Sequence, residues 1–269
     1  MEVKVVLITG GSSGIGAATA KVLADAGMKV YAGSRRGTVE TASANIVPVK
    51  LDVNDESKLK EAVADILSRE GHLDAVIVNA GNGLYGSMEG TLDEEARAQF
   101  ETTLFGSHKT IQACLPAFRA QGWGRIITIT SVMAILELPF QGLYSSAKAA
   151  LLSLTESFAM ELKGSGIQCC SILPGDVSTG FTKARRMNAA AEDPASPYKK
   201  AMESNLRKIE KDETGGMKPE VIGKAILKQL RRRSMKMRVI PGFEYRLVAF
   251  LVRICPSKLR LSIVKALYN

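Results

Sequence analysis

Short apolar, β-branched runs alternate along this chain with longer stretches of helical periodicity. Strands joined by connections this long need right-handed crossovers, so they form a parallel sheet with helices on both faces. The pattern therefore predicts an α/β fold with a doubly wound, mostly parallel sheet. The expected strands lie at about residues 3–9, 28–33, 46–51, 73–78, 124–130, 166–173 and 237–240.

The chain of 269 residues is long enough to form one domain with a sizeable core. We expect that single domain to cover residues 1–240. Residues 180–216 interrupt the alternation, because they are rich in charge, Ala and Pro and carry no strand signal. This pattern predicts a lid insertion or a mobile loop. Residues 241–269 mix apolar and basic residues at helical spacing and are predicted to be a helical extension of the same domain.

A glycine-rich turn follows the first expected strand and opens a helical stretch. Glycines permit a tight turn and let the backbone approach a ligand closely, and the free N–H groups of a helix N-terminus favour an anion such as a pyrophosphate. The turn therefore predicts a dinucleotide cofactor held by Gly10, Ser12, Ser13, Gly14, Ile15 and Gly16.

The spacing of this turn, GxxxGxG, resembles that of the short-chain dehydrogenase/reductase family. Further motifs of the same family extend the resemblance over residues 3–179. It implies a Rossmann fold and an oxidoreductase that acts on CH–OH or C=O groups with NAD(P), similar to hydroxysteroid, retinol and other lipid-carbonyl enzymes.

The end of the second expected strand indicates which nicotinamide cofactor is preferred. NAD-preferring folds commonly place an acidic residue there to bind the ribose 2′-hydroxyl. By resemblance Ser34 takes the place of that acid, and the guanidinium of Arg35 follows it, suited to a 2′-phosphate. We therefore expect NADP(H) to be preferred, with NAD(H) as a weaker cofactor.

Three other strand ends carry family motifs. By resemblance, the two residues after the third strand contact the adenine. The three residues after the fourth strand stabilise the sheet and line the cofactor. The loop after the sixth strand binds the nicotinamide carboxamide. These residues are Asp52 and Val53; Asn79, Ala80 and Gly81; and Pro174, Gly175, Val177 and Thr179.

A possible proton donor and its partner stand four residues apart at the start of an expected helix over 143–162. Reduction of a ketone needs a proton donor at the developing alkoxide and a polarising hydrogen bond to the same oxygen. The spacing puts Tyr144 and Lys148 on one helical face, where the ammonium would lower the pKa of the phenol. Ser131 lies thirteen residues before Tyr144, as in the family, so Ser131, Tyr144 and Lys148 are the expected catalytic residues.

One position departs from the family pattern. Thr103 stands three residues before Gly106, where the family usually has an asparagine that helps hold a water next to the lysine. Threonine keeps a hydroxyl but lacks the amide. We expect either another group to complete the proton relay or a slower proton transfer.

The side chains expected around the reacting carbon are largely apolar, which favours a lipid-, steroid- or retinoid-like carbonyl or alcohol, although several of them could simply pack the core. A β-ketoacyl thioester reductase is the nearest alternative, because three basic residues follow on the lid. A catalytically weak NADP-binding sensor is another. The apolar residues are Leu84, Tyr85, Met88, Met133, Ile135, Leu136, Leu138, Phe140 and Phe181, and the basic ones are Lys183, Arg185 and Arg186.

The net charge of +9 is concentrated at the C-terminal end, where residues 228–269 contain eleven Lys or Arg and one acid. This distribution, without a nucleic-acid-binding motif, predicts no nucleic-acid partner. Mixed apolar and basic residues at about 244–255 and 259–268 predict either helices that contact an anionic membrane peripherally or a cover over the pocket or a subunit contact. By resemblance we expect a homodimer or homotetramer formed through helices near 96–120 and 143–162.

The cysteines and histidines offer no metal-ligand pattern. Four cysteines form no CxxC pair, and His72 and His108 lie far apart, so we expect no metal site and reduced thiols. The N-terminus runs directly into the first expected strand, which points to a cytoplasmic protein.

Overall fold

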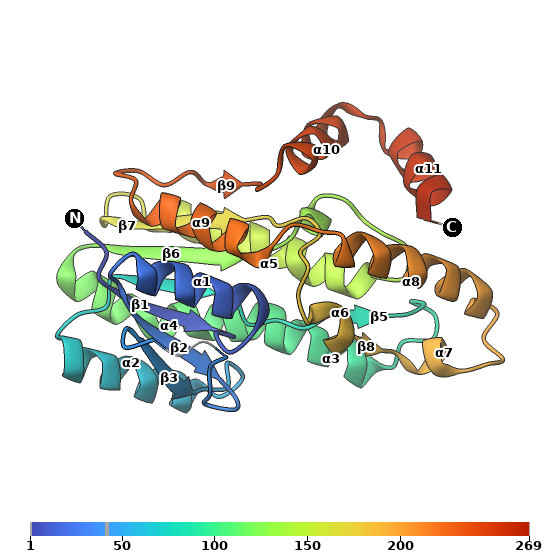
Figure 1. Ribbon diagram of the computed structural model, residues 1–269. Helices are drawn as coiled ribbons and strands as arrows, with labels where there is room; N and C mark the ends of the chain where they lie inside the picture. The colour runs from blue at the N-terminus through green and yellow to red at the C-terminus, as the bar shows by residue number, and fades with distance from the viewer. Residues whose placement is uncertain (1, 41–42, 269) are drawn as a thin grey trace.

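The computed structural model describes residues 2–40 and 43–268. Its centre is a seven-stranded sheet in the order β3-β2-β1-β4-β6-β7-β9, in which every pair of neighbours is parallel (Figure 1). The predicted doubly wound α/β fold is therefore confirmed, and each expected strand is present. The strands are β1 (Val5–Thr9), β2 (Lys29–Ser34), β3 (Ile46–Lys50), β4 (Ala75–Val78), β6 (Gly124–Ile129), β7 (Ile167–Ile172) and β9 (Arg238–Val239).

Helices cover both faces of this sheet, because successive strand residues point to opposite sides. In β1, Val6 and Ile8 pack with one apolar cluster, whereas Val5 and Leu7 pack with a second cluster on the opposite face. The first cluster includes residues of α1 (Gly14–Asp25) and α9 (Pro219–Leu230). The second includes residues of α2 (Glu56–Glu70), α4 (Gly106–Gln121) and α5 (Gly142–Glu161).

The expected single helix around residues 96–120 is broken into three parts. After α3 (Asp93–Phe100), the five residues of η1 (Glu101–Phe105) form a π-helix, and α4 continues from there. The periodicity of the sequence does not reveal this widened turn. Such π-helical turns are frequent at functional sites, and this one contains Thr103.

The predicted lid insertion contains α6 (Phe181–Ala184), β8 (Arg186–Met187), α7 (Ala189–Glu192) and α8 (Lys199–Thr214). The expectation that it holds no strand was wrong. β8 pairs in parallel with β5 (Leu84–Tyr85) in a separate two-stranded sheet. A strand of two residues leaves no periodic signal, and its partner lies about a hundred residues earlier in the chain.

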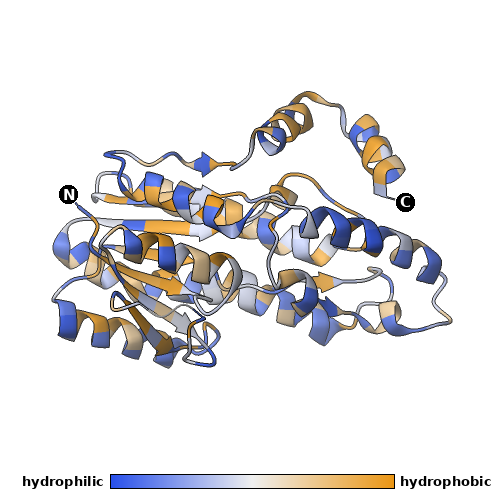
Figure 2. Ribbon diagram, in the orientation of Figure 1, coloured by the Kyte–Doolittle hydropathy of each residue, from blue (hydrophilic) through white to orange (hydrophobic). Residues whose placement is uncertain are grey.

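The C-terminal residues form two helices, α10 (Phe243–Ile254) and α11 (Ser257–Tyr268), above the body of the molecule in Figure 1. Figure 2 shows apolar residues along both of them. No helix in the described part of the chain is long and apolar enough to cross a membrane. Large apolar side chains of the two helices are nevertheless exposed, at Phe243, Leu247, Phe250, Leu251, Ile254, Leu259, Leu261, Ile263 and Leu267.

Candidate active site

The family motifs meet at one edge of the sheet, because the carboxyl ends of parallel strands lie together. The glycine turn follows β1, Asn79 follows β4, Ser131 follows β6 and Pro174 follows β7. Strands β1 and β4 are neighbours in the sheet. The strand order changes direction at β1, because β2 lies on one side of it and β4 on the other. Ligands of open α/β sheets bind at this kind of position.

The glycine turn is tightly folded against its surroundings. Gly10 and Gly14 have φ values of 66° and 54°, which favour glycine. A side chain at Gly16 would overlap the carbonyl oxygen of Gly10. The turn leads into α1, whose first turn has no acidic residue, so the N-terminus of the helix is electrostatically open to an anion.

Asn79 ties the end of β4 to this turn. Its Nδ2 donates to the carbonyl oxygens of Thr9 at 3.1 Å and Gly10 at 3.0 Å. In return, the Thr9 hydroxyl accepts from the backbone N–H groups of Asn79 at 3.1 Å and Ala80 at 3.2 Å. These bonds fix the turn relative to the sheet, in agreement with the stabilising role expected for Asn79.

The end of β2 brings a second arginine close to the turn. Ser34 is buried and accepts a hydrogen bond from the backbone of Gly37. The Arg36 guanidinium donates to the Ser12 hydroxyl at 3.4 Å, and both Arg35 and Arg36 are exposed residues. Only the geometry of the turn distinguishes the two neighbouring arginines, and Arg36 was not singled out by the sequence.

The two residues after β3, Asp52 and Val53, have different surroundings. The Asp52 carboxylate accepts from the backbone N–H of Asn54 at 3.0 Å, so it stabilises the turn there. Val53 is buried and packs where Gly106 begins α4, so closely that a side chain at Gly106 would collide with it. The Asp52 carboxylate therefore holds the turn after β3, and the Val53 side chain packs against the start of α4.

Ser131, Tyr144 and Lys148 come together beside the end of β6. Ser131 begins η2 (Val132–Ala134), and its hydroxyl accepts from the backbone of Met133 at 3.1 Å. The Lys148 Nζ lies 5.8 Å from the centre of the Tyr144 ring and donates to the carbonyl oxygen of Ile129 at 2.9 Å. The spacing of four residues in α5 thus produces the predicted pair on one helical face.

Burial dominates the ionisation of this pair in the protein alone. It raises the pKa of the Tyr144 phenol to about 12, an effect that the hydrogen bond with Ser131 reduces in part. It also lowers the pKa of the Lys148 ammonium to about 8. The expected lowering of the tyrosine pKa by the lysine is therefore not found, because desolvation favours the neutral form of both groups.

The loop after β7 faces the glycine turn. The Pro174 carbonyl accepts from the backbone of Val132 at 2.8 Å, which holds the loop beside Ser131. Val177 is buried and bridges to Met217, and Thr179 lies against Gly14, where an added Cβ would be 3.5 Å from the threonine Cβ. This loop thus contacts both the glycine turn, through Thr179, and the segment that follows Ser131, through Pro174.

The C-terminal helices reach the same loop, a contact that no sequence pattern indicates. The Tyr245 ring in α10 fills the space beside Gly175, and its hydroxyl donates to the Asp176 carboxylate at 2.8 Å. Burial raises the pKa of that carboxyl above its usual range, and the hydrogen bond from Tyr245 counters part of the effect. The Tyr268 hydroxyl of α11 donates to Asp212 of α8 at 3.3 Å.

The apolar residues expected around the substrate divide into two groups. Tyr85 is fully buried in a cluster with Phe140 and Met202, so both aromatic residues pack against the insertion at residues 180–216. Phe181, by contrast, faces Tyr144 with ring centres 5.9 Å apart. Buried Leu84 also belongs to the packed group, Leu138 lines a groove with α11, Met88 is exposed, and Met133, Ile135 and Leu136 are partly exposed.

Of the three basic residues expected on the lid, Arg185 is already paired. Its guanidinium forms a buried ion pair with Glu213 of α8. Lys183 and Arg186 are exposed. An anionic group of a substrate would therefore meet at most these two cations, because the Glu213 carboxylate neutralises the third.

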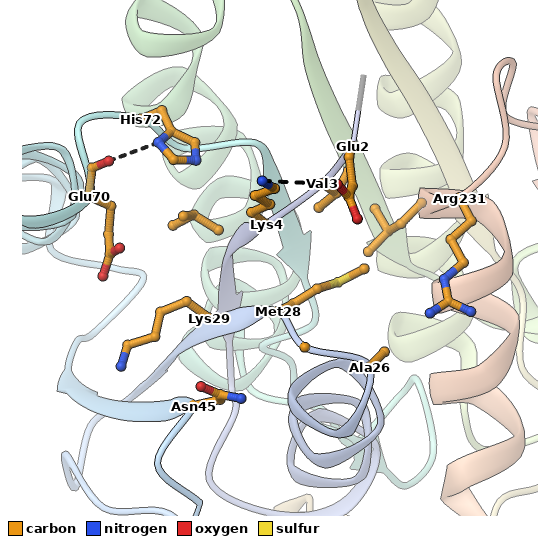
Figure 3. Close-up of a pocket in the computed structure, with 13 residues that line it drawn as sticks. Glu2, Val3, Lys4, Ala26, Met28, Lys29, Asn45, Glu70, His72 and Arg231 are labelled. Carbon is orange, nitrogen blue, oxygen red and sulfur yellow. Dashed lines mark hydrogen bonds and ion pairs between the residues drawn. The ribbon is translucent and has the colours of Figure 1, made fainter.

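A separate hollow lies at the opposite, amino-terminal edge of the sheet (Figure 3). It is lined by charged surface residues, among them Glu2, Lys29 and Arg231, and by His72, whose ring nitrogen is hydrogen-bonded to the Glu70 carbonyl. None of the motif residues lines it. The described residues also include no group of three or more His, Cys, Asp or Glu that could hold a metal ion.

Comparison with known proteins agrees with this arrangement. The chain is 35% identical over 245 residues to a 3-ketodihydrosphingosine reductase of Bacteroides thetaiotaomicron, covering 90% of this chain and 89% of that one. It is 30% identical to the 3-oxoacyl-[acyl-carrier-protein] reductase of Thermotoga maritima, covering 84% and 90%. A short-chain dehydrogenase structure from Streptomyces avermitilis superposes with a TM-score of 0.83 at 28% identity, covering 98% and 97%.

A second structure, a short chain dehydrogenase from Burkholderia cenocepacia in complex with NADP, superposes with a TM-score of 0.76 at 25% identity and covers 97% of both chains. Residues 4–190 match the model of the short chain dehydrogenase family. The chain therefore belongs to the short chain dehydrogenase family and is an oxidoreductase that acts on CH–OH or C=O groups.

Proposed function

We propose that the protein transfers a hydride between NADP(H) and the ketone or secondary alcohol of a hydrophobic, lipid-like substrate. The observation that carries this proposal is the grouping of Ser131, Tyr144 and Lys148 between the glycine turn and the loop 174–179. The similarity to a 3-ketodihydrosphingosine reductase supports a ketone on a long apolar chain as the substrate class.

The residues at the sheet edge fit a nicotinamide dinucleotide. The turn at Gly10 and Gly14 and the acid-free N-terminus of α1 suit a pyrophosphate, and Arg36 beside Ser12 adds positive charge where a 2′-phosphate would lie. When bound, the cofactor supplies or accepts the hydride. The residues that would hold it are Gly10, Ser12, Ser13, Gly14, Ile15, Gly16, Ser34, Arg35, Arg36, Asp52, Val53, Asn79, Ala80, Gly81, Tyr144, Lys148, Pro174, Gly175, Val177 and Thr179.

In this proposal the three catalytic side chains act on the substrate oxygen. Tyr144 donates the proton to the developing alkoxide, and Ser131 donates a hydrogen bond that polarises the same oxygen. Lys148, held by the Ile129 carbonyl, stabilises the phenolate that Tyr144 leaves behind. In the direction of alcohol oxidation, the same groups work in reverse.

The substrate would approach from the side of Phe181, over partly exposed Met133, Ile135 and Leu136. A β-ketoacyl thioester reductase remains the second candidate, and the similarity to the Thermotoga maritima reductase favours it. The pairing of Arg185 with Glu213 counts against it, because a phosphopantetheine carrier needs free cations at the entrance.

The test is a turnover screen with NADPH that compares long-chain ketones, steroid ketones and β-ketoacyl thioesters. We expect the first two classes to react faster, and Tyr144→Phe to lose turnover by at least a hundredfold while it still binds NADPH. Binding of NADPH without turnover of any substrate would support a sensor protein instead. Preference for the thioesters would support the alternative enzyme.

We also propose that residues 241–269 are an extension of the single domain and contact an anionic membrane peripherally. The two helices expose apolar side chains together with Arg246, Arg253, Lys258 and Lys265, while Tyr245 and Tyr268 anchor them to the body of the molecule. A membrane surface would concentrate a lipophilic substrate near the site.

A further inference from the structure

Thr103 stands where the family usually has an asparagine, and the side chain of Gln99 lies beside it. Thr103 is fully buried in η1, and Gln99 lies four residues earlier, on the same helical face at the end of α3. Gln99 is 1% exposed, and its Nε2 donates to the Thr103 hydroxyl at 2.9 Å. A carboxamide is therefore present beside Thr103, although it comes from a different position in the chain.

The orientation of this carboxamide is fixed. The Gln99 Nε2 also donates to the backbone carbonyl oxygen of Asn82 at 3.1 Å, and a carbonyl oxygen only accepts. The other end of the amide, Oε1, is buried and accepts no hydrogen bond from the residues that the structure describes. A buried acceptor of this kind needs a donor, and an ordered water commonly supplies it.

Lys148 borders the same space. A Cβ added to Gly81 would lie 3.5 Å from the Lys148 Nζ and 3.9 Å from the Thr103 hydroxyl oxygen, so the absence of a side chain at Gly81 leaves room between the two groups. Lys148 has three N–H donors, and one of them is used by Ile129. The Lys148 ammonium and the Thr103 hydroxyl therefore border the same space, where a water would find both a donor and an acceptor.

We propose that Gln99 and Thr103 are positioning residues that hold a water beside the Lys148 ammonium and so provide the proton relay. The inference rests on the proposed function. In the direction of reduction, Tyr144 gives its proton to the substrate oxygen, Lys148 releases a proton toward the phenolate, and the held water returns one to Lys148. Solvent then replaces the proton of the water, and no oxidant or reductant is needed.

The first test compares Gln99→Leu and Thr103→Val with the wild type. Each variant should lower kcat at least tenfold, leave KM and the Kd for NADPH within twofold, and increase the solvent deuterium isotope effect on kcat, because proton return becomes limiting. Thr102→Val is the matched control, since the Thr102 hydroxyl accepts from Asn54 instead, and it should keep the wild-type kcat. Adding Thr103→Asn to Gln99→Leu should restore part of kcat.

A second test does not depend on activity. A high-resolution crystal structure of the wild type with NADPH should show an ordered water within hydrogen-bonding distance of the Gln99 Oε1, connected to the Lys148 Nζ directly or through one further water. The same water should be absent in Gln99→Leu. A wild-type structure without it would overturn the inference, even if a variant failed to fold.

The inference would also be overturned by an unchanged kcat and isotope effect in Gln99→Leu, or by a loss of NADPH binding equal to the loss of kcat. The proposed function has a separate indicator. If Tyr144→Phe is inactive and Gln99→Leu is fully active, only the relay is wrong. If Tyr144→Phe keeps its activity, the catalytic assignment itself fails.

Discussion

Among single residues, the two neighbouring arginines after β2 differ in their contacts, because only one of them is hydrogen-bonded to the glycine turn. Arg36 reaches Ser12 in the glycine turn, and Arg35 lies next to it in the chain; both residues are exposed. A 2′-phosphate next to buried Ser34 would be within the reach of both long side chains. A charge-assisted hydrogen bond contributes roughly 1.5–3 kcal/mol, which corresponds to about a tenfold to hundredfold preference.

We therefore predict that the wild type binds NADPH at least tenfold more tightly than NADH. Arg35→Ala and Arg36→Ala should each weaken NADPH binding, and the double variant should bind the two cofactors equally, because no cation then faces the 2′-phosphate. Dissociation constants measured at fixed salt check this, with Arg69→Ala on α2 as a surface control. A preference that survives in the double variant would contradict the assignment.

Lys148 is buried, and its burial disfavours the positive charge with which it would stabilise the Tyr144 phenolate. The folded-state pKa is lowered to about 8 from an ordinary value of 10.5. Between these two values the unfolded chain binds more protons than the folded protein, so the free energy of unfolding contributed by this group rises with pH.

Replacing Lys148 with Met should raise the free energy of unfolding at pH 7 by roughly 1–3 kcal/mol, because a buried charge is removed. The difference from the wild type should shrink between pH 8 and about 10, where the wild-type lysine loses its proton on folding. Urea unfolding at several pH values measures this. A constant difference across that range would show that Lys148 folds with its ordinary pKa.

Among the helices, η1 and the C-terminal helices bring side chains to the candidate site that the local sequence pattern does not predict. The π-helical turn holds Thr103 opposite Lys148, and α10 brings Tyr245 onto the loop 174–179. Large apolar residues of α10 and α11 are exposed, and each basic residue beside them would contribute about 1 kcal/mol to binding if the helices met an anionic surface.

We predict that the protein sediments with vesicles of phosphatidylcholine and phosphatidylserine at low salt, and much less with phosphatidylcholine alone. The double variant Phe250→Glu, Ile254→Glu should abolish binding, because both side chains are exposed on α10. Val221→Glu on α9 is the control for an added surface charge. If the intact protein ignores anionic vesicles, the tail is better explained as a lid or a subunit contact.

At the scale of the whole molecule, one sheet edge collects motifs that are spread from residue 9 to residue 179. The long helices α4 and α5 lie on one face of the sheet, and small residues of α5 such as Ala149 and Ala150 are partly exposed. We propose that these helices form the contact of a homodimer or homotetramer. Light scattering should give a mass at least twice the 28.9 kDa of one chain, and a monomer at all working concentrations would contradict this.

The parts of this protein that depend on local order can be read from its amino-acid sequence. The alternation of strands and helices, the glycine turn and the spacing of Tyr144 and Lys148 are all encoded within short windows, where backbone preference and periodicity act directly. The seven parallel strands and the neighbouring positions of Ser131, Tyr144 and Lys148 could therefore be predicted.

Which side chains from distant parts of the chain meet depends on how the helices and strands pack. The pairing of β8 with β5, the ion pair of Arg185 with Glu213 and the contact of Tyr245 with Asp176 each join residues at least 28 positions apart. Gln99 and Thr103 are close in sequence, yet their relation to Lys148 depends on the packing of η1 against α5. Contacts of this kind follow from how whole elements pack, and no short stretch of sequence carries that information.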